Sequence, residues 1–305
     1  MLRAYPHTDT CPDALDGPFP KGFSLPLHIL VVSSETPSQE DERRAYSGQA
    51  SHESYADALR RLRPDITLDT ASCLTHSENL TQSKFTRYDG IVFAGSPIQM
   101  HKDTGETRLA AAFMCHVFDA GVPSFGSCAG LQIAATAAGG RTGPRKPGAE
   151  VAFARDITRT VDGASHPLLS GRPQTWTAPA MHSSVVTGLP PHTRILASNP
   201  DTPVEVAEIR CGPGRFWGVQ YHPELSLGEI AGSLCHQADD VVGQGLAQSR
   251  EDVEDFAQLL QTLDANPERA DLAWRFGLND EVTLFDRRMV EVENFLNAIQ
   301  RGQLR

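Results

Sequence analysis

The feature that constrains this chain most is a cysteine set between two glycines, at a point where a strand runs into a helix. Val122 to Ser127 form a short apolar run typical of a buried strand, and it leads into Gly126-Ser127-Cys128-Ala129-Gly130. Leu131 to Ala138 are rich in alanine and predict a helix, which the glycine pair that follows can end. Strand, Gly-x-Cys-x-Gly turn and helix together predict a sharp turn that presents the cysteine.

Such a turn favours a reactive cysteine. The turn is tight, so the flanking side chains must be very small, which accounts for Gly126 and Gly130. It pushes the sulfur of Cys128 clear of the sheet and points the N-terminus of the next helix at it, where the helix dipole favours a thiolate. The structural alternative is a small buried hydrophobe, which is the common role of a free cysteine. The motif alone leaves both interpretations open.

A second motif supplies the groups that a nucleophilic thiol needs. Phe216 to Tyr221 predict a strand, and it is followed directly by His222-Pro223-Glu224. A thiol nucleophile requires a base, and the base requires an acceptor that orients it. His222 and Glu224 can fill these two roles, held in a fixed relation by the proline between them. The two motifs together predict a catalytic triad of Cys128, His222 and Glu224.

At these residues the chain resembles a class I (triad-type) glutamine amidotransferase domain over about residues 27–225, similar to the glutaminase domain of GMP synthetase and to γ-glutamyl peptidases. Tyr88 to Ala94 predict a strand that enters Gly95-Ser96-Pro97, where the family carries a Gly-Gly-Pro or Gly-Ser-Pro loop. Met181-His182-Ser183-Ser184-Val185 resembles the family's Ser-His-x-Asp-x-Val stretch, which lines the glutamine pocket. Ser184 stands where the family commonly has Asp, and Met181 stands where it commonly has Ser or Asn. These two departures leave the identity of the substrate undecided.

The resemblance implies an α/β fold, flavodoxin-like and doubly wound around a mostly parallel sheet. It implies that the backbone N–H groups of Ser96 and Ala129 stabilise the oxyanion of the tetrahedral intermediate. It calls for no cofactor and takes a small-molecule substrate, either glutamine or a γ-glutamyl compound. The substrate-binding residues that it implies are Gly95, Gln132, Met181, His182, Ser183 and Ser184.

Three functions are compatible with this pattern. The first is a glutaminase that hydrolyses the side-chain amide of glutamine through a γ-glutamyl thioester and supplies ammonia to an acceptor or a partner synthetase; the core motifs favour it. The second is a γ-glutamyl hydrolase or peptidase that uses the same triad on γ-glutamyl amines or peptides, which suits the departures at Met181 and Ser184. The third is a non-catalytic scaffold, against which the complete triad argues.

Composition narrows the range of partners. The chain has 305 residues and a formal net charge of −11, and an acidic surface repels the phosphate backbone of nucleic acids. Its six cysteines have no C-x-x-C spacing, which argues against a disulfide framework or zinc ribbon and favours a reducing compartment. The eleven histidines form no metal-binding motif. No apolar run approaches the roughly 20 residues of a membrane span, and no signal-peptide core is present, so we expect a cytoplasmic protein.

The chain divides into three predicted parts. Residues 1–26 are a proline-rich N-terminal extension, and residues 27–225 are the amidotransferase-like domain. Strands alternating with helices up to the cysteine motif predict a parallel sheet, and shorter β-like runs after residue 150 predict an antiparallel region. Residues 35–50 are polar and predict a loop near the site. Glu205 and Glu208 alternate with apolar residues, which predicts the exposed face of a strand, with Glu205 within reach of the site.

Residues 226–305 form a predicted helical C-terminal extension, because domains of this family commonly stop soon after the His-Pro-Glu motif. Two apolar stripes at helical spacing run through it, centred on Leu260 and Phe295. If the extension docks a partner synthetase or a second copy of the chain, the stripes should be partly exposed. If it braces the domain, they should be buried against residues 27–225, and a self-sufficient γ-glutamyl hydrolase becomes the better expectation.

Overall fold

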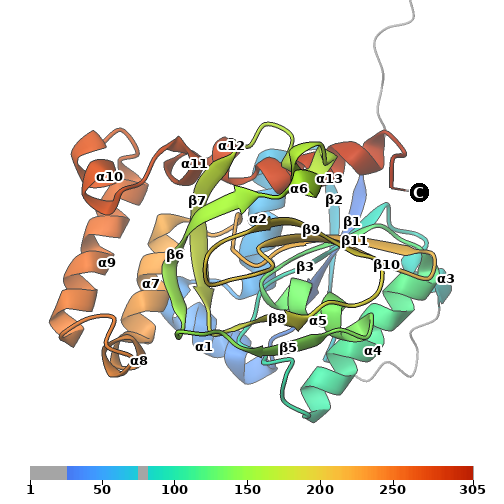
Figure 1. The fold of residues 1–305 in the computed structure, drawn as a ribbon, viewed down its shortest axis with the longest axis horizontal. Coiled ribbons are helices and arrows are strands. Elements are labelled where there is room, and N and C mark those ends of the chain that lie inside the picture. The colour runs from blue at the N-terminus through green and yellow to red at the C-terminus, as the bar shows by residue number, and fades with distance from the viewer. Residues whose placement is uncertain (1–25, 75–81, 305) are drawn as a thin grey trace, which may run out of the picture.

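One nine-stranded sheet, ordered β2-β1-β3-β4-β11-β10-β9-β6-β7, carries the fold (Figure 1). The structure is a computed structural model that describes residues 26–74 and 82–304, so all but the last residue of the predicted N-terminal extension lies outside the described residues. Parallel pairing joins the first five strands of that order. They are β2 (Thr67–Ser72), β1 (His28–Ser33), β3 (Gly90–Phe93), β4 (Ser124–Ser127) and β11 (Gly214–Val219).

The other strands of the sheet pair antiparallel, as the short β-like runs predicted. They are β10 (Val206–Cys211), β9 (Thr193–Ser198), β6 (Glu150–Arg159) and β7 (Thr175–His182). A separate two-stranded sheet pairs β5 (Arg141–Pro144) with β8 (Ser184–Gly188). This arrangement confirms the predicted flavodoxin-like α/β fold.

Helices cover both faces of the sheet, which makes it doubly wound. Alternate residues of a strand point to opposite faces, and neighbouring residues of β3 follow that rule. Val92 packs in one core with α2 (Ser51–Leu62) and α13 (Val290–Gln300). Phe93 packs in the opposite core with α4 (Gly105–Ala120) and α5 (Ala129–Ala137).

The segment predicted as a loop after β1 is largely a helix, α1 (Pro37–Ser47). Thr36 caps its N-terminus by accepting a hydrogen bond from the backbone N–H of Gln39, and the Gln39 side chain accepts one from the Thr36 N–H in return. None of its residues is buried, so its sequence lacks the apolar period by which helices are recognised. The prediction was wrong because capping, not packing, marks this helix.

Helices follow the last strand to the end of the described chain. They are α7 (Leu227–His236), α8 (Ala238–Gly243), α9 (Arg250–Ala265), α10 (Ala270–Phe276), α11 (Asp280–Thr283), α12 (Phe285–Arg288) and α13. Earlier short helices are α3 (Gln82–Phe85), α6 (Val161–Ala164) and the 3-10 turn Pro167–Leu169. None of the helices in the described part of the chain is long and apolar enough to cross a membrane.

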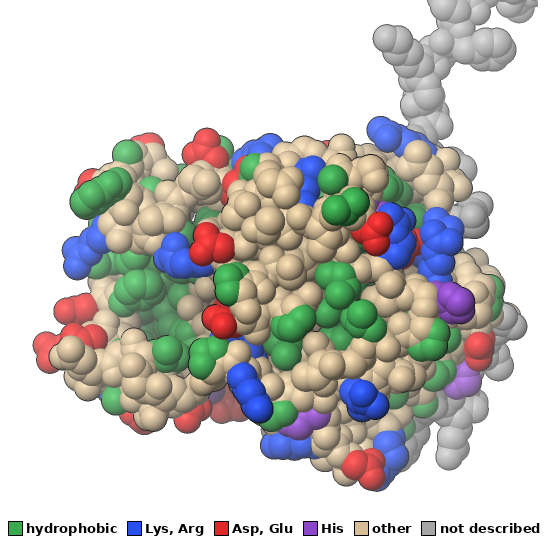
Figure 2. Space-filling view, in the orientation of Figure 1, with side chains coloured by type: hydrophobic (Ala, Val, Ile, Leu, Met, Phe, Trp, Pro, Cys, Tyr) green, Lys and Arg blue, Asp and Glu red, His purple; other side chains and the backbone are tan. Residues whose placement is uncertain are grey.

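Both apolar stripes of the C-terminal segment are largely buried. Phe295 of α13 is fully buried in the sheet core, where its ring packs against that of Phe125. Leu260 of α9 is fully buried in a third hydrophobic cluster, separate from the two cores of the sheet. This cluster joins α7 and α9 to Phe153 of β6. Figure 2 shows hydrophobic side chains in the hollow between these helices and β6, and Phe256 on α9 is 36% exposed. Burial of the stripes is the outcome expected if the C-terminal segment packs against residues 27–225 and stabilises them.

Candidate active site

The cysteine motif folds into the sharp turn that its glycines predict. Cys128 lies between β4 and α5 with φ 51° and ψ −104°, a conformation that non-glycine residues rarely adopt. A Cβ atom on Gly126 would lie 2.9 Å from the Cα of Gly130, and one on Gly130 would lie 2.9 Å from the carbonyl oxygen of Phe93. Both glycines are therefore required by close backbone approach, and the strained turn holds the thiol at a cavity.

His222 and Glu224 meet this cysteine because their strand is its neighbour. β11 pairs with β4 in parallel register, so the residues after both strands emerge at the same edge of the sheet. The Nδ1 atom of His222 lies 2.7 Å from Oε1 of Glu224, and the sulfur of Cys128 is close enough to the ring to raise its pKa. A backbone hydrogen bond of 2.8 Å from the His222 N–H to the carbonyl of Pro179 fixes the segment.

The electrostatics of the site favour a charged imidazole. Burial of His222 lowers its pKa, but the carboxylate of Glu224 and the sulfur of Cys128 outweigh burial and raise that pKa to about 10. The ring is thus protonated at neutral pH and can give a proton to a leaving group. A thiol beside such a ring is the arrangement of a cysteine nucleophile with its acid–base partner.

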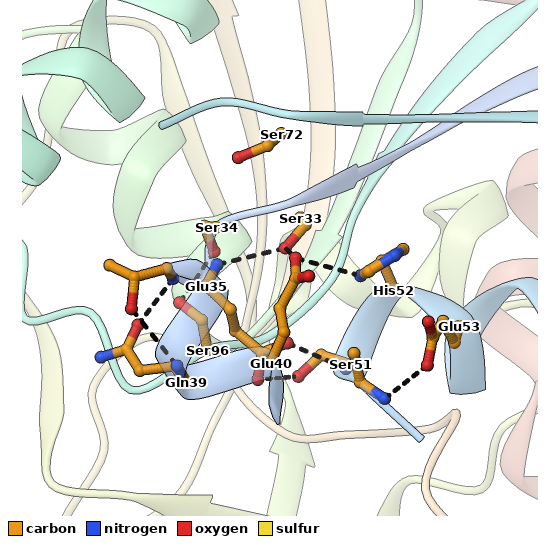
Figure 3. Close-up of polar contacts among 12 residues, drawn as sticks. Ser33, Ser34, Glu35, Gln39, Glu40, Ser51, His52, Glu53, Ser72 and Ser96 are labelled. Atoms are coloured by element: carbon orange, nitrogen blue, oxygen red, sulfur yellow. Dashed lines mark hydrogen bonds and ion pairs between the residues drawn. The ribbon is translucent and has the colours of Figure 1, made fainter. Parts of the chain in front are cut away.

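The loop after β3 closes against the same imidazole. A Cβ atom on Gly95 would lie 2.4 Å from Cε1 of His222, so this glycine makes room for the ring. Ser96 lines the cavity, and its hydroxyl oxygen accepts a hydrogen bond of 2.7 Å from Ser34 at the end of β1 (Figure 3). Ala129, the other predicted oxyanion donor, opens α5 directly after Cys128.

The residues of the 181–184 stretch, at the end of β7 and the start of β8, line the cavity with Gln132. The side-chain amide of Gln132 donates to the carbonyl oxygen of Ser184 at 2.8 Å. Nε2 of His182 lies 2.9 Å from Oε2 of Glu150, while its Nδ1 atom and the Oε1 atom of Gln132 have no hydrogen-bond partner among the described residues. The substrate-binding residues predicted by resemblance, including Met181 and the exposed Ser183, therefore gather at one cavity.

Sequence patterning misjudged two glutamates. Glu205 and Glu208 are fully buried rather than exposed. Glu205 accepts a hydrogen bond of 2.8 Å from Asn199, and burial, with the nearby Glu150 charge, raises its pKa well above the usual value. Oε2 of Glu208, a residue of β10, lies 3.3 Å from Nε2 of His166. Alternation predicted exposure because it cannot distinguish a solvated carboxylate from one buried in a polar network.

The cavity has a volume of about 360 Å³ and extends beyond the predicted glutamine pocket. Its outer wall includes part of the 35–50 segment, which sequence analysis placed near the site, and helices after residue 226, to which it gave no site role. Helix α1 contributes Glu42, Arg43 and Tyr46. His236 at the end of α7, Gln237 between the helices and Asp240 of α8 form the rest of this wall. No motif marks them, because the wall forms only when segments about 190 residues apart in sequence pack together.

Side-chain contacts fix this outer wall. The rings of Tyr46 and His236 stack with centroids 4.3 Å apart, and His236 lies 3.3 Å from the carboxylate of Glu42. Gln244, just after α8, accepts a hydrogen bond of 3.0 Å from the backbone N–H of Ala149 on the opposite rim. The C-terminal helices are thus part of the cavity and not only its support.

One group of possible metal ligands lies beside the cavity, in the described part of the chain. Oxygen and nitrogen atoms of Glu35, Glu40 and His52 lie within 4.8 Å of one another (Figure 3). Both carboxylate oxygens of Glu35 already accept hydrogen bonds from Ser51, at 2.7 and 2.9 Å, and Glu40 accepts one from Ser33. These protein donors satisfy the carboxylates without an ion.

The fold and this site define the class of the protein, and comparison with known families agrees. The family model described as glutamine amidotransferase class-I matches residues 47–237. The chain therefore belongs to the class-I glutamine amidotransferase family. The matched range leaves out most of α1 and all helices from α8 onward, so the outer wall of the cavity lies largely outside it.

Individual relatives add detail. The chain is 28% identical over 276 residues to a gamma-glutamyl-L-1-hydroxyisopropylamide hydrolase from a Pseudomonas species, covering 90% of this chain and 93% of that protein. It is 31% identical over 159 residues to a glutamine-hydrolysing GMP synthase subunit from Ignicoccus hospitalis, covering 52% of this chain and 78% of that protein. The solved structure of a glutamine amidotransferase from Thermotoga maritima covers 90% of this chain and 98% of its own with a TM-score of 0.60 at 11% identity, a likeness of fold.

Proposed function

We propose that this chain is a self-sufficient cysteine hydrolase of γ-glutamyl amides, which releases glutamate and a small amine. The observation that carries the proposal is the cavity at Cys128, because its outer wall is made by the chain's own α1, α7 and α8. A glutaminase that passes ammonia to a synthetase needs an exit there, whereas a hydrolase of larger amides needs a wall that contacts the amine. The hydrolase relative from Pseudomonas, which aligns along 90% of this chain, supports the same choice.

The first half of the reaction forms a thioester. The Cys128 thiolate attacks the γ-carbonyl carbon, and backbone N–H groups of Ser96 and Ala129 hold the oxyanion, each donor contributing about 3–4 kcal/mol in comparable sites. As the carbon–nitrogen bond breaks, the imidazolium of His222 gives its proton to the departing amine. Glu224 keeps the ring oriented and stabilises its charged form through the hydrogen bond of 2.7 Å.

The second half regenerates the enzyme. The neutral His222 ring takes a proton from water, the water oxygen attacks the thioester carbon, and the carbon–sulfur bond breaks to give glutamate and the Cys128 thiolate. Gln132 and His182 are placed to bind the glutamyl part, since each keeps a polar atom with no partner among the described residues. Gly95, Met181, Ser183 and Ser184 complete that part of the cavity.

A second candidate is a glutaminase that supplies ammonia to a partner synthetase. The GMP synthase relative from Ignicoccus hospitalis favours it, at 31% identity over about half of this chain. That alignment covers 52% of this chain, whereas the alignment to the hydrolase relative covers 90%. Product analysis separates the two candidates, because a glutaminase releases ammonia from glutamine and a γ-glutamyl hydrolase releases the amine from substituted amides.

The test is steady-state hydrolysis of L-glutamine and of γ-glutamyl ethylamide by the purified chain, with ammonia and ethylamine measured separately. The proposal expects a larger kcat/KM for the ethylamide, with no added protein. A preference for glutamine, or activity that appears only when a synthetase is added, would favour the glutaminase. Cys128→Ala is the control for contaminating amidases and should be inactive on both substrates.

A further inference from the structure

The residues that directly precede the nucleophile and the base turn their side chains away from the cavity. Successive residues of an extended chain point to opposite sides, so Ser127 and Tyr221 lie beneath the site that Cys128 and His222 form. The hydroxyl of Ser127 lies 3.2 Å from that of Tyr55 on α2. The hydroxyl of Tyr221 donates a hydrogen bond of 2.7 Å to Glu291 on α13. Both catalytic segments therefore rest on buried hydroxyl contacts.

Glu291 is held by an arginine that is itself buried. Nε and Nη2 of Arg172 donate to the two carboxylate oxygens of Glu291, each at 2.6 Å, in a bidentate pair. Arg172 also donates to Glu281 at 2.6 Å and to the backbone carbonyl of Arg288 at 2.7 Å. Glu291 is fully buried and Arg172 is 5% exposed, so water does not compete for these bonds.

Such an ion pair is an inefficient way to stabilise a core. Burying two charges removes them from water, and well-packed apolar residues of similar size commonly give equal or greater stability. The pair does fix a carboxylate oxygen at one point, and that oxygen receives the Tyr221 hydroxyl. Burial raises the pKa of Tyr221 and of Tyr55, so both phenols remain neutral hydrogen-bonding groups.

The segment carrying the base needs this anchor. Strand β11 ends at Val219, so Tyr221 and His222 lie beyond its regular ladder of hydrogen bonds. The backbone bond from His222 to Pro179 holds one side of the segment. The Tyr221 side chain holds the opposite side, packed at 6.4 Å between ring centroids against Trp176 and fixed at its tip by Glu291.

We propose that Glu291, clamped by Arg172, acts as a positioning residue for the catalytic base, by fixing Tyr221 and through it the imidazole of His222. The inference rests on the proposed function. It gives the C-terminal segment a second role in catalysis: α7 and α8 line the cavity, and α13 holds the base in place from behind the sheet.

The test compares Tyr221→Phe, which removes one hydroxyl and keeps the ring, with Glu291→Gln. The matched control is Glu281→Gln, since Glu281 binds the same arginine but does not contact Tyr221. With γ-glutamyl ethylamide we expect Tyr221→Phe and Glu291→Gln to lower kcat about 10-fold, because a small misplacement of a catalytic group slows reaction sharply. KM and the control should stay within about two-fold of the parent.

A second readout needs no substrate. The rate at which iodoacetamide alkylates Cys128, followed by peptide mass mapping from pH 5 to 10, reports the imidazolium beside the thiol. In Tyr221→Phe the alkylation rate at neutral pH should fall, because a displaced imidazole no longer pairs with the thiol. An unchanged profile and kcat in Tyr221→Phe would overturn the inference, even if its melting temperature drops or Glu291→Gln fails to fold. If the parent hydrolyses neither amide but its Cys128 profile depends on Tyr221, the proposed function fails and the positioning role stands.

Discussion

At the scale of single residues, neighbouring groups set the position and the charge of the His222 imidazole. Glu224 holds one ring nitrogen, the Cys128 sulfur interacts with the ring, and Gly95 leaves room for it where a Cβ atom would lie 2.4 Å from Cε1. Glu224 and Cys128 favour the charged ring, whereas burial alone would lower the pKa of His222. Small changes at any of the three should therefore act on catalysis before they act on folding.

Gly95→Ala tests this enclosure. The added methyl group would lie 2.4 Å from Cε1 of His222, so the ring must move. We expect kcat/KM to fall about 100-fold with little change in melting temperature, as a misplaced catalytic group of this kind causes. The matched control is Gly105→Ala, where a Cβ atom meets nothing within 4 Å. Equal activity of the two variants would show that the ring tolerates displacement.

The three triad members should not be equal. Cys128→Ala should abolish turnover without unfolding, because its side chain faces the cavity. His222→Ala should cost nearly as much, since the two act as a unit. Glu224→Ala should cost less, about 100-fold in kcat, because Glu224 orients and stabilises the ring without reacting. Kinetic constants for the three variants check the order, and a Glu224 variant as slow as the Cys128 variant would contradict it.

Stability should depend on pH through His222. Its pKa rises from 6.5 to about 10 on folding, so the stabilising contribution of its proton is complete below pH 6.5 and is lost as pH rises toward 10. The free energy of unfolding should fall across this window, by at most about 1.4 kcal/mol per pH unit for one proton. Glu224→Gln should flatten the fall in urea titrations at pH 6 and pH 9. An identical slope in the variant would remove Glu224 as the source of the shift.

At the scale of elements, local motifs were predictable and long-range contacts were not. The turn at Cys128 follows from Gly126 and Gly130, because the steric demand lies within five residues. The same holds for His222 and Glu224, which share one short segment. Helix α1 was missed because it buries no residue and has no apolar period, and its sequence signal is the capping box of Thr36 and Gln39. The position of residues 35–50 near the site was predicted, but the contact of Tyr46 with His236 was not, because it forms only in the folded chain.

Helix α13 should matter to stability as a core element. Phe295 is fully buried against Phe125 and Trp217 of the sheet, so Phe295→Ala should lower the free energy of unfolding by about 3–5 kcal/mol. Phe256→Ala on α9 is the matched control, since that ring is 36% exposed and should cost much less. Urea unfolding of both variants checks the difference. A chain lacking residues 250–305 should fail to fold, whereas an active truncated enzyme would mean that α13 is dispensable.

At the scale of the whole molecule, the described chain encloses its own cavity. Helix α1 and the helices α7 and α8 line the same cavity as Cys128. The apolar stripes of the C-terminal segment are largely buried in the clusters of the chain itself. The surface of the chain carries a net charge of −11, so repulsion also opposes close association with another acidic protein. These features support the proposed hydrolase, which would need no synthetase.

The most direct test of the account is covalent labelling with 6-diazo-5-oxo-L-norleucine, a glutamine analogue whose diazoketone loses nitrogen as it alkylates a thiolate. Intact mass and peptide mapping should find one label per chain, on Cys128, formed in competition with γ-glutamyl ethylamide and absent from Cys128→Ala. Labelling of any of the other five cysteines instead, or no labelling of a folded parent enzyme, would contradict a γ-glutamyl-binding site at Cys128.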